Sequence, residues 1–486
     1  MLGKKDRWQG DLFVACGLRE LVPDDHILKC VDKVLDLSWL REEVKDCYCL
    51  DNGRPGIDPE AAVRLMLAGF FQGITKDRKL LREAQVNLAI RWFAGYRLHE
   101  DLPHHSTLTK IRQRWGPERF KKIFERTVQA CVDADLVSGE TVHVDATLIR
   151  ADVSWSSLTE RHAEQVIAEN ADADPPSDPA DNGDKPKRGR RRTRDKKPKK
   201  ISRTDPDATL STSSREERME PCFKQHTAVD DKAGVVVDVA ATTGEASEGK
   251  ELMGQIARVE ARLECELDTV TADAGYAHAE NYGELELAGI EAVIPPPPEP
   301  RSKKRYPSRR FTYDALHDVV RCPRRRVLRS SHRQANGWIY RARTKDCKRC
   351  PLRAECVGRG QSSRTLYISN NHTALVRARR DRLRWDEVKR RWYTRHRWRV
   401  EGAHGEAKTQ HGLRRAARRG LANVAIQIYL TAAVMNLKRL AGALLREIRR
   451  LRPVRWPSGV HGTPTRGSAA CLGADAARIR RTRRAA

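Results

Sequence analysis

The stretch Phe223-Lys-Gln-His-Thr-Ala-Val-Asp-Asp-Lys-Ala-Gly-Val-Val-Val-Asp-Val-Ala-Ala241 decides the fold. It contains two runs of apolar and β-branched residues, Phe223–Val229 and Val235–Ala241, separated by the polar turn residues Asp230-Asp-Lys-Ala-Gly. Two such runs joined by a short glycine-containing loop are typical of a β-hairpin. The sequence therefore predicts a pair of antiparallel strands near the middle of the chain.

Strands and helices alternate around this hairpin. Residues 140–150 are typical of a buried strand, and four prolines at 295–298 end the downstream elements. After the hairpin we expect a helix, a strand, a helix and a strand, over Glu251–Leu263, Leu267–Ala272, Ala279–Leu287 and Ile290–Ile294. This order predicts an α/β fold with a mixed sheet flanked by helices.

The N-terminal part is expected to be all-helical. Over residues 57–130, Pro59 stands at the start of one helix, a second fits Asp77–Asn87, and Ser106 caps a third over Thr107–Trp115. Several short helices ending in a basic one are typical of a DNA-binding domain. The alternative is a scaffold bundle with a solvated basic face.

The chain is strongly basic, which indicates a polyanionic partner. Its 486 residues, enough for two to four domains, include 93 Lys+Arg against 65 Asp+Glu, a net charge of +28. Such a charge favours nucleic acid, because each neutralised phosphate releases counterions, although a solubilising surface is the alternative. The candidate DNA-binding side chains on the third N-terminal helix are Lys110, Arg112 and Arg114.

No feature of the sequence indicates a membrane or a secretory route. The start, Met1-Leu-Gly-Lys-Lys-Asp, lacks an apolar core, and the longest apolar stretch, Val424–Met435, is well short of the roughly 20 residues that span a bilayer. We expect a cytoplasmic, nucleoid-associated protein. Its twelve cysteines are then not a disulfide framework.

Two segments contain too few apolar residues to form a hydrophobic core. An acidic, proline-rich run followed by a dense Lys/Arg run predicts a disordered basic linker over 170–205, after a helical segment over Leu158–Asn170. The tail over 450–486 is also basic and predicted to be disordered. The linker is interpreted as a non-specific DNA arm or, alternatively, as a solvated connection.

Two aspartates follow short apolar runs in matching contexts. Asp145 ends Thr-Val-His-Val-Asp, and Asp273 ends Thr-Val-Thr-Ala-Asp. The carboxyl ends of strands are where α/β sheets place their active sites, although a single aspartate there is more often a turn or cap residue. Two of them together indicate a candidate catalytic pair.

A third candidate carboxylate, Glu401, lies in a basic stretch predicted to be one helix over Asp386–His411. At helical spacing it shares a face with other polar and basic side chains. These are Arg397, His404, Lys408 and Arg415. The alternative interpretation is a simple ion pair between Arg397 and Glu401, four residues apart on a solvated helix.

This combination resembles the DDE transposases of bacterial insertion sequences, whose catalytic domain has an RNase H-like fold. The family pattern Tyr-(2)-Arg-(3)-Glu-(6)-Lys is matched by Arg397, Glu401 and Lys408, whereas Tyr393 stands one residue early. The other similar stretches begin at Trp92, His143, Lys224 and Thr271, and the resemblance covers roughly residues 10–445.

The resemblance implies a function and a cofactor. Asp145, Asp273 and Glu401 would hold two Mg²⁺ (or Mn²⁺) ions about 3.5–4 Å apart, for hydrolysis at the element's ends and then strand transfer into target DNA. Arg397, Lys408 and Arg415 would contact double-stranded DNA. Joining two ends at once implies a homodimer on DNA. The alternatives are an RNase H-like nuclease without strand transfer, and a non-catalytic DNA-binding protein such as a repressor or decayed transposase.

A cysteine group indicates a second metal. Its members, spaced C-x24-C-x2-C-x5-C, are Cys322, Cys347, Cys350 and Cys356. Thiolates at such spacing can surround a tetrahedral Zn²⁺, with His332 as a spare ligand, and the alternative is free thiols or small core residues. His143 and His226, near the predicted strands, are interpreted as structural residues.

These observations predict five parts. They are a helical, DNA-binding N-terminal domain over 1–130, the first part of an RNase H-like catalytic domain over 138–298, a Cys-containing insertion over 299–370, a C-terminal helical part carrying the glutamate over 371–449, and the basic tail over 450–486.

Overall fold

The computed structural model describes residues 17–49, 56–154, 158–160, 200–202, 204–212, 219–297, 306 and 310–451. By its internal contacts the chain divides into a large unit, Met1–Gly442, and a C-terminal unit, Ala443–Ala486. Most of the predicted linker, and the predicted tail beyond residue 451, lie outside the described residues.

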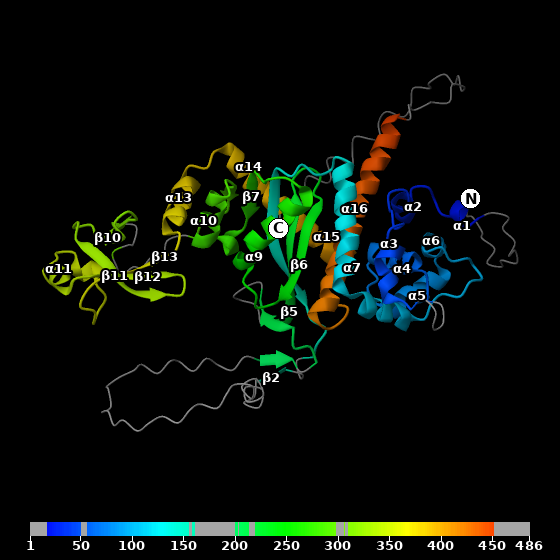
Figure 1. The fold of residues 1–486 in the computed structure, drawn as a ribbon, viewed down its shortest axis with the longest axis horizontal. Helices are drawn as coiled ribbons and strands as arrows, with labels where there is room; N and C mark the ends of the chain where they lie inside the picture. The colour runs from blue at the N-terminus through cyan, green and yellow to red at the C-terminus, as the bar shows by residue number, and fades with distance from the viewer. Residues whose placement is uncertain are drawn as a thin grey trace, which may run out of the picture. The chain divides into compact units, whose positions relative to one another are not determined.

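A six-stranded sheet forms the centre of the large unit (Figure 1). Its strands are β1 (Thr141–Arg150), β4 (Thr209–Ser211), β5 (Glu220–Asp230), β6 (Val236–Thr243), β7 (Thr269–Ala272) and β8 (Glu291–Val293). Strand β5 pairs antiparallel with β1, β4 and β6, whereas β1, β7 and β8 run parallel. This is the strand order of an RNase H-like fold, and the predicted mixed sheet with its hairpin is confirmed.

Two helices make the parallel crossovers possible. Helix α9 (Glu248–Leu263) connects β6 to β7, and α10 (Ala279–Leu287) connects β7 to β8, as predicted. Parallel neighbours need such crossover connections. Helix α9 buries Leu252, Ile256 and Val259, spaced four and three residues apart on one face.

Helix α16 (Leu421–Leu451) belongs to the core up to the end of the large unit. The buried Asn436 amide holds the start of β6 with both its groups: its Oδ1 accepts from the Val236 N–H and its Nδ2 donates to the Val236 carbonyl, each at 2.9 Å. Among the described residues, this is the one helix long and apolar enough to cross a membrane, and 67% of its apolar window is buried.

The N-terminal helices confirm most predicted boundaries. They are α1 (Leu18–Leu21), α2 (Ile27–Asp32), α3 (Leu40–Val44), α4 (Pro59–Phe71), α5 (Asp77–Val86), α6 (Leu88–Phe93) and α7 (His105–Asp133). The predicted start of α7 is wrong, because His104 rather than Ser106 caps it. Its predicted end at Trp115 is confirmed by a break within α7: Gly116 takes a positive φ of 68°, and a second helical stretch begins at Pro117.

Arg112 is not available to DNA. Its guanidinium is 3% exposed and donates to both carboxylate oxygens of Asp77 at 2.7 and 2.8 Å. Arg418 donates to the same carboxylate at 2.8 Å. Arg112 therefore stabilises the core, while its neighbours Lys110 and Arg114 are exposed as predicted.

A separate antiparallel sheet carries the cysteine group. Its strands follow one another in the order β9 (Thr312–Asp314), β10 (Val319–Arg321), β11 (Val327–Gln334), β12 (Gly337–Ala342) and β13 (Thr365–Ser369). Short helices α11 (Thr344–Lys348) and α12 (Arg353–Cys356) follow β12. The small core is centred on Val320, Leu328 and Tyr340, with Cys322 and Cys347 packed against it.

The predicted helix over Asp386–His411 is not uniform. After α13 (His372–Leu383), the chain forms α14 (Glu387–His396), a π-helical turn η5 (Arg397–Glu401) and α15 (Gly402–Gln410). A π turn inserts a residue into the helical repeat, so positions before and after it no longer follow one α-helical face.

The helix predicted from Leu158 is wrong at its start. Residues Leu158–Glu160 form strand β2, antiparallel to β3 (Lys200–Ser202), because pairing with a segment forty residues away overrides the local pattern. The rest of that prediction lies outside the described residues.

Candidate active site

The two predicted aspartates stand side by side in the sheet. Val144 of β1 and Ala272 of β7 are paired in parallel register, and the next residue on each strand is Asp145 or Asp273. Neighbouring strands lie about 4.8 Å apart. Asp273 follows the end of β7 as predicted, but Asp145 lies within β1, which continues to Arg150 beside β5.

Glu401 reaches the same region from η5. Burial raises the pKa of Asp145 to about 7, and repulsion from the carboxylates of Asp273, Glu248 and Glu401 adds to this, against a hydrogen bond from the Ala146 N–H. The side chain of Glu401 is 62% exposed and accepts from Arg397 Nε at 3.2 Å. Asp145 thus lies within electrostatic reach of both Asp273 and Glu401.

A fourth carboxylate, Glu248, was not predicted. It lies in the first turn of α9, and its Oε1 pairs with Lys224 of β5 at 2.9 Å. Burial raises the pKa of Asp273, and Glu248 adds to the effect. Gly275 leaves room for both groups, since a Cβ there would lie 2.9 Å from Asp273 Oδ1 and 3.2 Å from Glu248 Oε2. No spacing in the sequence ties Glu248 to the aspartates.

His404 of α15 borders Asp145. Its Nδ1 lies 3.7 Å from Asp145 Oδ2, and its Nε2 is 3.1 Å from Thr227 Oγ1 on β5. Burial lowers the pKa of His404 to about 3, with a further contribution from Lys408. The ring is therefore neutral at physiological pH and supports the site through packing and hydrogen bonding.

The predicted DNA-binding residues differ in whether they lie near the carboxylates. Burial lowers the pKa of Lys408, with Arg414 and Arg150 nearby, while Asp145 opposes this, so Lys408 lies near the carboxylates. Arg415, however, is not on the helical face, because α15 ends at Gln410. It bridges to Arg150 of β1 and lies 3.7 Å from Asp152. Neither Lys110 nor Arg114 of α7 takes part in this cluster; the Arg114 guanidinium lies over the Tyr48 ring.

The carboxylates suit a hard divalent cation by their chemistry. Oxygen donors are what Mg²⁺ and Mn²⁺ prefer, and a cation would relieve the repulsion that raises the pKa of Asp145. Within the described part of the chain, however, no group of three or more His, Cys, Asp or Glu side chains is arranged to hold a metal ion.

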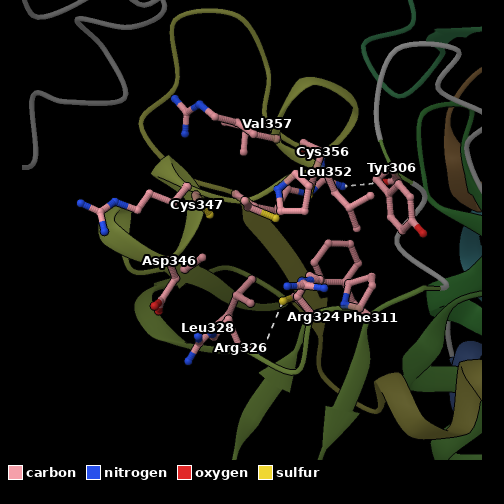
Figure 2. Close-up of a pocket in the computed structure, with 18 of the residues that line it drawn as sticks. Tyr306, Phe311, Arg324, Arg326, Leu328, Asp346, Cys347, Leu352, Cys356 and Val357 are labelled. Carbon is pink, nitrogen blue, oxygen red and sulfur yellow. Dashed lines mark hydrogen bonds between the residues drawn. The ribbon is translucent and has the colours of Figure 1, made fainter.

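All four predicted zinc ligands line one cavity of about 220 Å³ (Figure 2). At Cys322 the backbone folds tightly around the sulfur: the Arg326 N–H donates to Cys322 Sγ at 3.3 Å, the Arg325 N–H donates to the Cys322 carbonyl at 2.7 Å, and Arg325 has a φ of +58°. Burial raises the pKa of Cys356, with contributions from the three other thiols. His332, the spare candidate, does not line this cavity.

Asp145→Asn is expected to stabilise the metal-free protein at pH 8. A folded-state pKa raised to about 7 gives stability that is present below about pH 4 and lost as the pH rises through 7. Asparagine has no carboxyl group to ionise, so it removes this loss. Between pH 5 and pH 8, the free energy of unfolding of the variant rises by roughly 2–4 kcal/mol relative to wild type. Urea unfolding in chelator measures it. Glu387→Gln, at an exposed carboxylate that is not among the charges acting on Asp145, is the control. An unchanged pH dependence in Asp145→Asn would refute the raised pKa of Asp145.

The structure places Asp145 and Asp273 on adjacent central strands of an RNase H-like sheet, with Glu401 on a helical segment near Asp145. Two segments of the chain match known families. Residues 17–114 match a transposase domain (DUF772), and residues 321–441, which include Glu401, match a transposase DDE domain. Both matched families are transposase families, and the predicted resemblance to insertion-sequence DDE transposases is confirmed.

Similar solved structures are also transposases. A piggyBac transposase synaptic complex with hairpin DNA is 10% identical over 93% of this chain and 87% of that chain, with a TM-score of 0.29. A Mos1 transposase paired-end complex is 12% identical over 52% of this chain and 65% of that chain, with a TM-score of 0.15. The assignment of the fold rests on the strand order of the central sheet and not on these matches. No curated protein matches the chain.

Proposed function

We propose that this protein is a DNA transposase that cleaves at the terminal inverted repeats of its own element and joins the 3′ ends to target DNA. The convergence of Asp145, Asp273 and Glu401 on an RNase H-like sheet supports this function more than any other observation. The two transposase-family segments support the same class.

The carboxylates are proposed to hold Mg²⁺ or Mn²⁺, which would activate an attacking water or 3′-hydroxyl and stabilise the leaving oxygen. The protein's own groups prepare this site. The Lys224–Glu248 pair holds a fourth carboxylate beside Asp273, and Arg397 orients Glu401 through its Nε contact. Neutral His404 covers Asp145 without adding charge.

DNA is proposed to bind over the carboxylates. Lys408 offers a cation near Asp145, and the exposed Arg414 lies near Lys408, while the exposed Arg415 lies beside Arg150 of β1. Phosphates flanking the scissile bond would lie along these side chains. Arg397 would turn from Glu401 to a phosphate at little cost, because both side chains are largely exposed.

The predicted five-part organisation is kept as part of this proposal. The helical N-terminal part, with exposed Lys110 and Arg114, would bind the element's ends. DNA cleavage and joining would take place in the cytoplasm, on the nucleoid. A homodimer would hold two ends together, because strand transfer joins both to one target.

A cleavage and joining assay tests the function. Labelled duplexes carrying the inverted repeats that flank the gene are incubated with Mg²⁺, either intact or already cleaved at the 3′ end. A transposase nicks the intact duplex and joins the cleaved one to plasmid DNA. Cleavage without joining would indicate a nuclease, and metal-independent binding alone would indicate a non-catalytic DNA-binding protein; either result overturns the proposal.

The cysteine cavity is proposed to hold a structural Zn²⁺. Four thiols at one cavity match the ligand number of a structural zinc site, and the tight turn at Cys322 already directs a backbone N–H at one sulfur. Arg364, which lines the same cavity, opposes the effect of burial on the pKa of Cys356. Binding would draw the four sulfurs together and join β10 to helices α11 and α12.

We expect purified protein to contain about one zinc per chain, and Cys350→Ser to lose both this zinc and several degrees of thermal stability. Elemental analysis and thermal unfolding measure the two effects. Cys49→Ser, at an exposed cysteine outside the cavity, is the control that keeps its zinc. Wild-type protein without zinc, purified in the absence of chelator, would end the proposal.

A further inference from the structure

A polar side chain stands two residues before each of the paired aspartates. His143 precedes Asp145 on β1, and Thr271 precedes Asp273 on β7. Residues two apart on a strand point to the same face of the sheet. His143 and Thr271 are also partners in the parallel register of β1 and β7, and both are completely buried. They therefore lie on the same face of the sheet as the carboxylates, two residues earlier along each strand.

Hydrogen bonds link His143 and Thr271 to each other and to two further side chains, Asp231 and His396. His143 Nε2 lies 3.0 Å from Asp231 Oδ1, and His143 Nδ1 lies 2.7 Å from Thr271 Oγ1. Thr271 Oγ1 in turn lies 2.9 Å from Nδ1 of His396, which is 4% exposed. We call Asp231, His143, Thr271 and His396 the buried relay.

Thr271 is the centre of the buried relay, because a hydroxyl group can both donate and accept hydrogen bonds. Its oxygen lies within hydrogen-bond distance of His143 Nδ1 on one side and of His396 Nδ1 on the other. Arg395 lies 2.7 Å from Asp231 Oδ2 and holds that carboxylate beside His143 Nε2. Removal of the Thr271 hydroxyl would therefore break both connections at the centre.

The buried relay ends at the segment that carries the glutamate. His396 is the last residue of α14, directly before the η5 turn that ends at Glu401. The ring of Tyr393 stacks on His396 with an interplanar angle of 8°. At the other end, Asp231 also holds Arg395 of α14 and lies 3.7 Å from Arg399 of η5. One network therefore touches β1, β7 and η5, the three elements that supply the carboxylates.

We propose that the buried relay, through Thr271, fixes the position of the η5 turn relative to Asp145 and Asp273 and thereby sets the affinity of the carboxylate site for its divalent cation. This inference rests on the proposed function, because it assumes that the three carboxylates share a cation. The residues of the buried relay are positioning residues, since none is itself one of the proposed ligands.

The test measures Mn²⁺ binding to the full chain without DNA, from the loss of the free-ion signal in electron paramagnetic resonance. Thr271→Val keeps the side-chain shape and removes the hydroxyl. It is expected to weaken Mn²⁺ binding about tenfold, as loss of supporting hydrogen bonds does at metal sites. Thr271→Ser keeps the hydroxyl and is expected to bind as wild type. Cleavage by Thr271→Val should recover at high Mg²⁺ concentration.

Thr242→Val is the matched control, because Thr242 Oγ1 lies 2.9 Å from His226 Nε2 in the same sheet, on β6, whose partner among the described strands is β5 and not β1 or β7. Equal Mn²⁺ affinity in Thr271→Val and wild type, or equal weakening in Thr242→Val, would overturn the positioning role. If Thr271→Val does not fold, His396→Asn and His396→Leu, which retain and remove a hydrogen-bonding side chain at this position, make the same comparison. Wild-type protein that binds no Mn²⁺ would instead contradict the proposed function.

Discussion

Glu401→Gln is expected to lower the rate of DNA cleavage by roughly a thousandfold or more while leaving the fold unchanged. The glutamate is one of three charged oxygen donors proposed at the reacting phosphate, and glutamine supplies no negative charge. Its contribution to stability is small, because the side chain is 62% exposed and contacts only Arg397 within the described network. Exposed ion pairs of this kind contribute at most about 1 kcal/mol.

Nicking of labelled end duplexes in Mg²⁺ measures this effect, with DNA binding measured separately in chelator. Glu387→Gln is the matched control, since Glu387 forms a similar exposed pair, four residues apart, with Arg391 on the same helical segment. The control should cleave as wild type. A Glu401→Gln protein that still nicks at the wild-type rate would remove Glu401 from the active site.

Asp77→Ala is expected to destabilise the protein by about 3–5 kcal/mol, the largest effect we expect on stability. Burial alone would raise the pKa of Asp77, but the guanidinium groups of Arg112 and Arg418 outweigh it and the pKa is lowered. Alanine leaves Arg112 buried without its counter-charge. The loss also separates α5 and α7 from the segment after α15, which supplies Arg418.

Urea unfolding at neutral pH measures this loss. Asp46→Ala serves as the control, because the pair of Asp46 with Arg119 leaves the Asp46 side chain 64% exposed and its loss should change the free energy of unfolding little. The double variant Asp77→Ala/Arg112→Met should recover part of the stability, because it removes the unpaired charge. If Asp77→Ala were no less stable than Asp46→Ala, the buried ion pair would not hold these helices.

The sheet was predictable because each strand carries its own pattern of apolar and β-branched residues. The hairpin turn and the prolines after β8 set its limits. The start of α7 was not predictable in the same way, since His104, a rare capping residue, competes with Ser106 two positions later. The η5 turn has no local sequence pattern that predicts it. The end of α15 at Gln410 leaves Arg415 outside the helix on which it was predicted to share a face with Glu401.

The candidate site was partly predictable for a related reason. Aspartates after two apolar runs meet because parallel strands bring their ends together. Glu248 could not be found, because its approach to Asp273 depends on how α9 packs across the sheet. Arg112 was misassigned to DNA because a charge pattern on a helix does not reveal which charges are buried against a partner from another helix.

Iron-directed cleavage of the protein chain tests most directly whether one divalent cation site joins the three carboxylates. Fe²⁺ replaces Mg²⁺ at oxygen-donor sites, and with ascorbate and peroxide it cuts the backbone beside the bound ion. We predict cuts near residues 145, 273 and 401 together, all suppressed by excess Mg²⁺ and all lost in Asp145→Asn. Cuts at only one of these positions, or a pattern that Asp145→Asn leaves unchanged, would contradict a shared site.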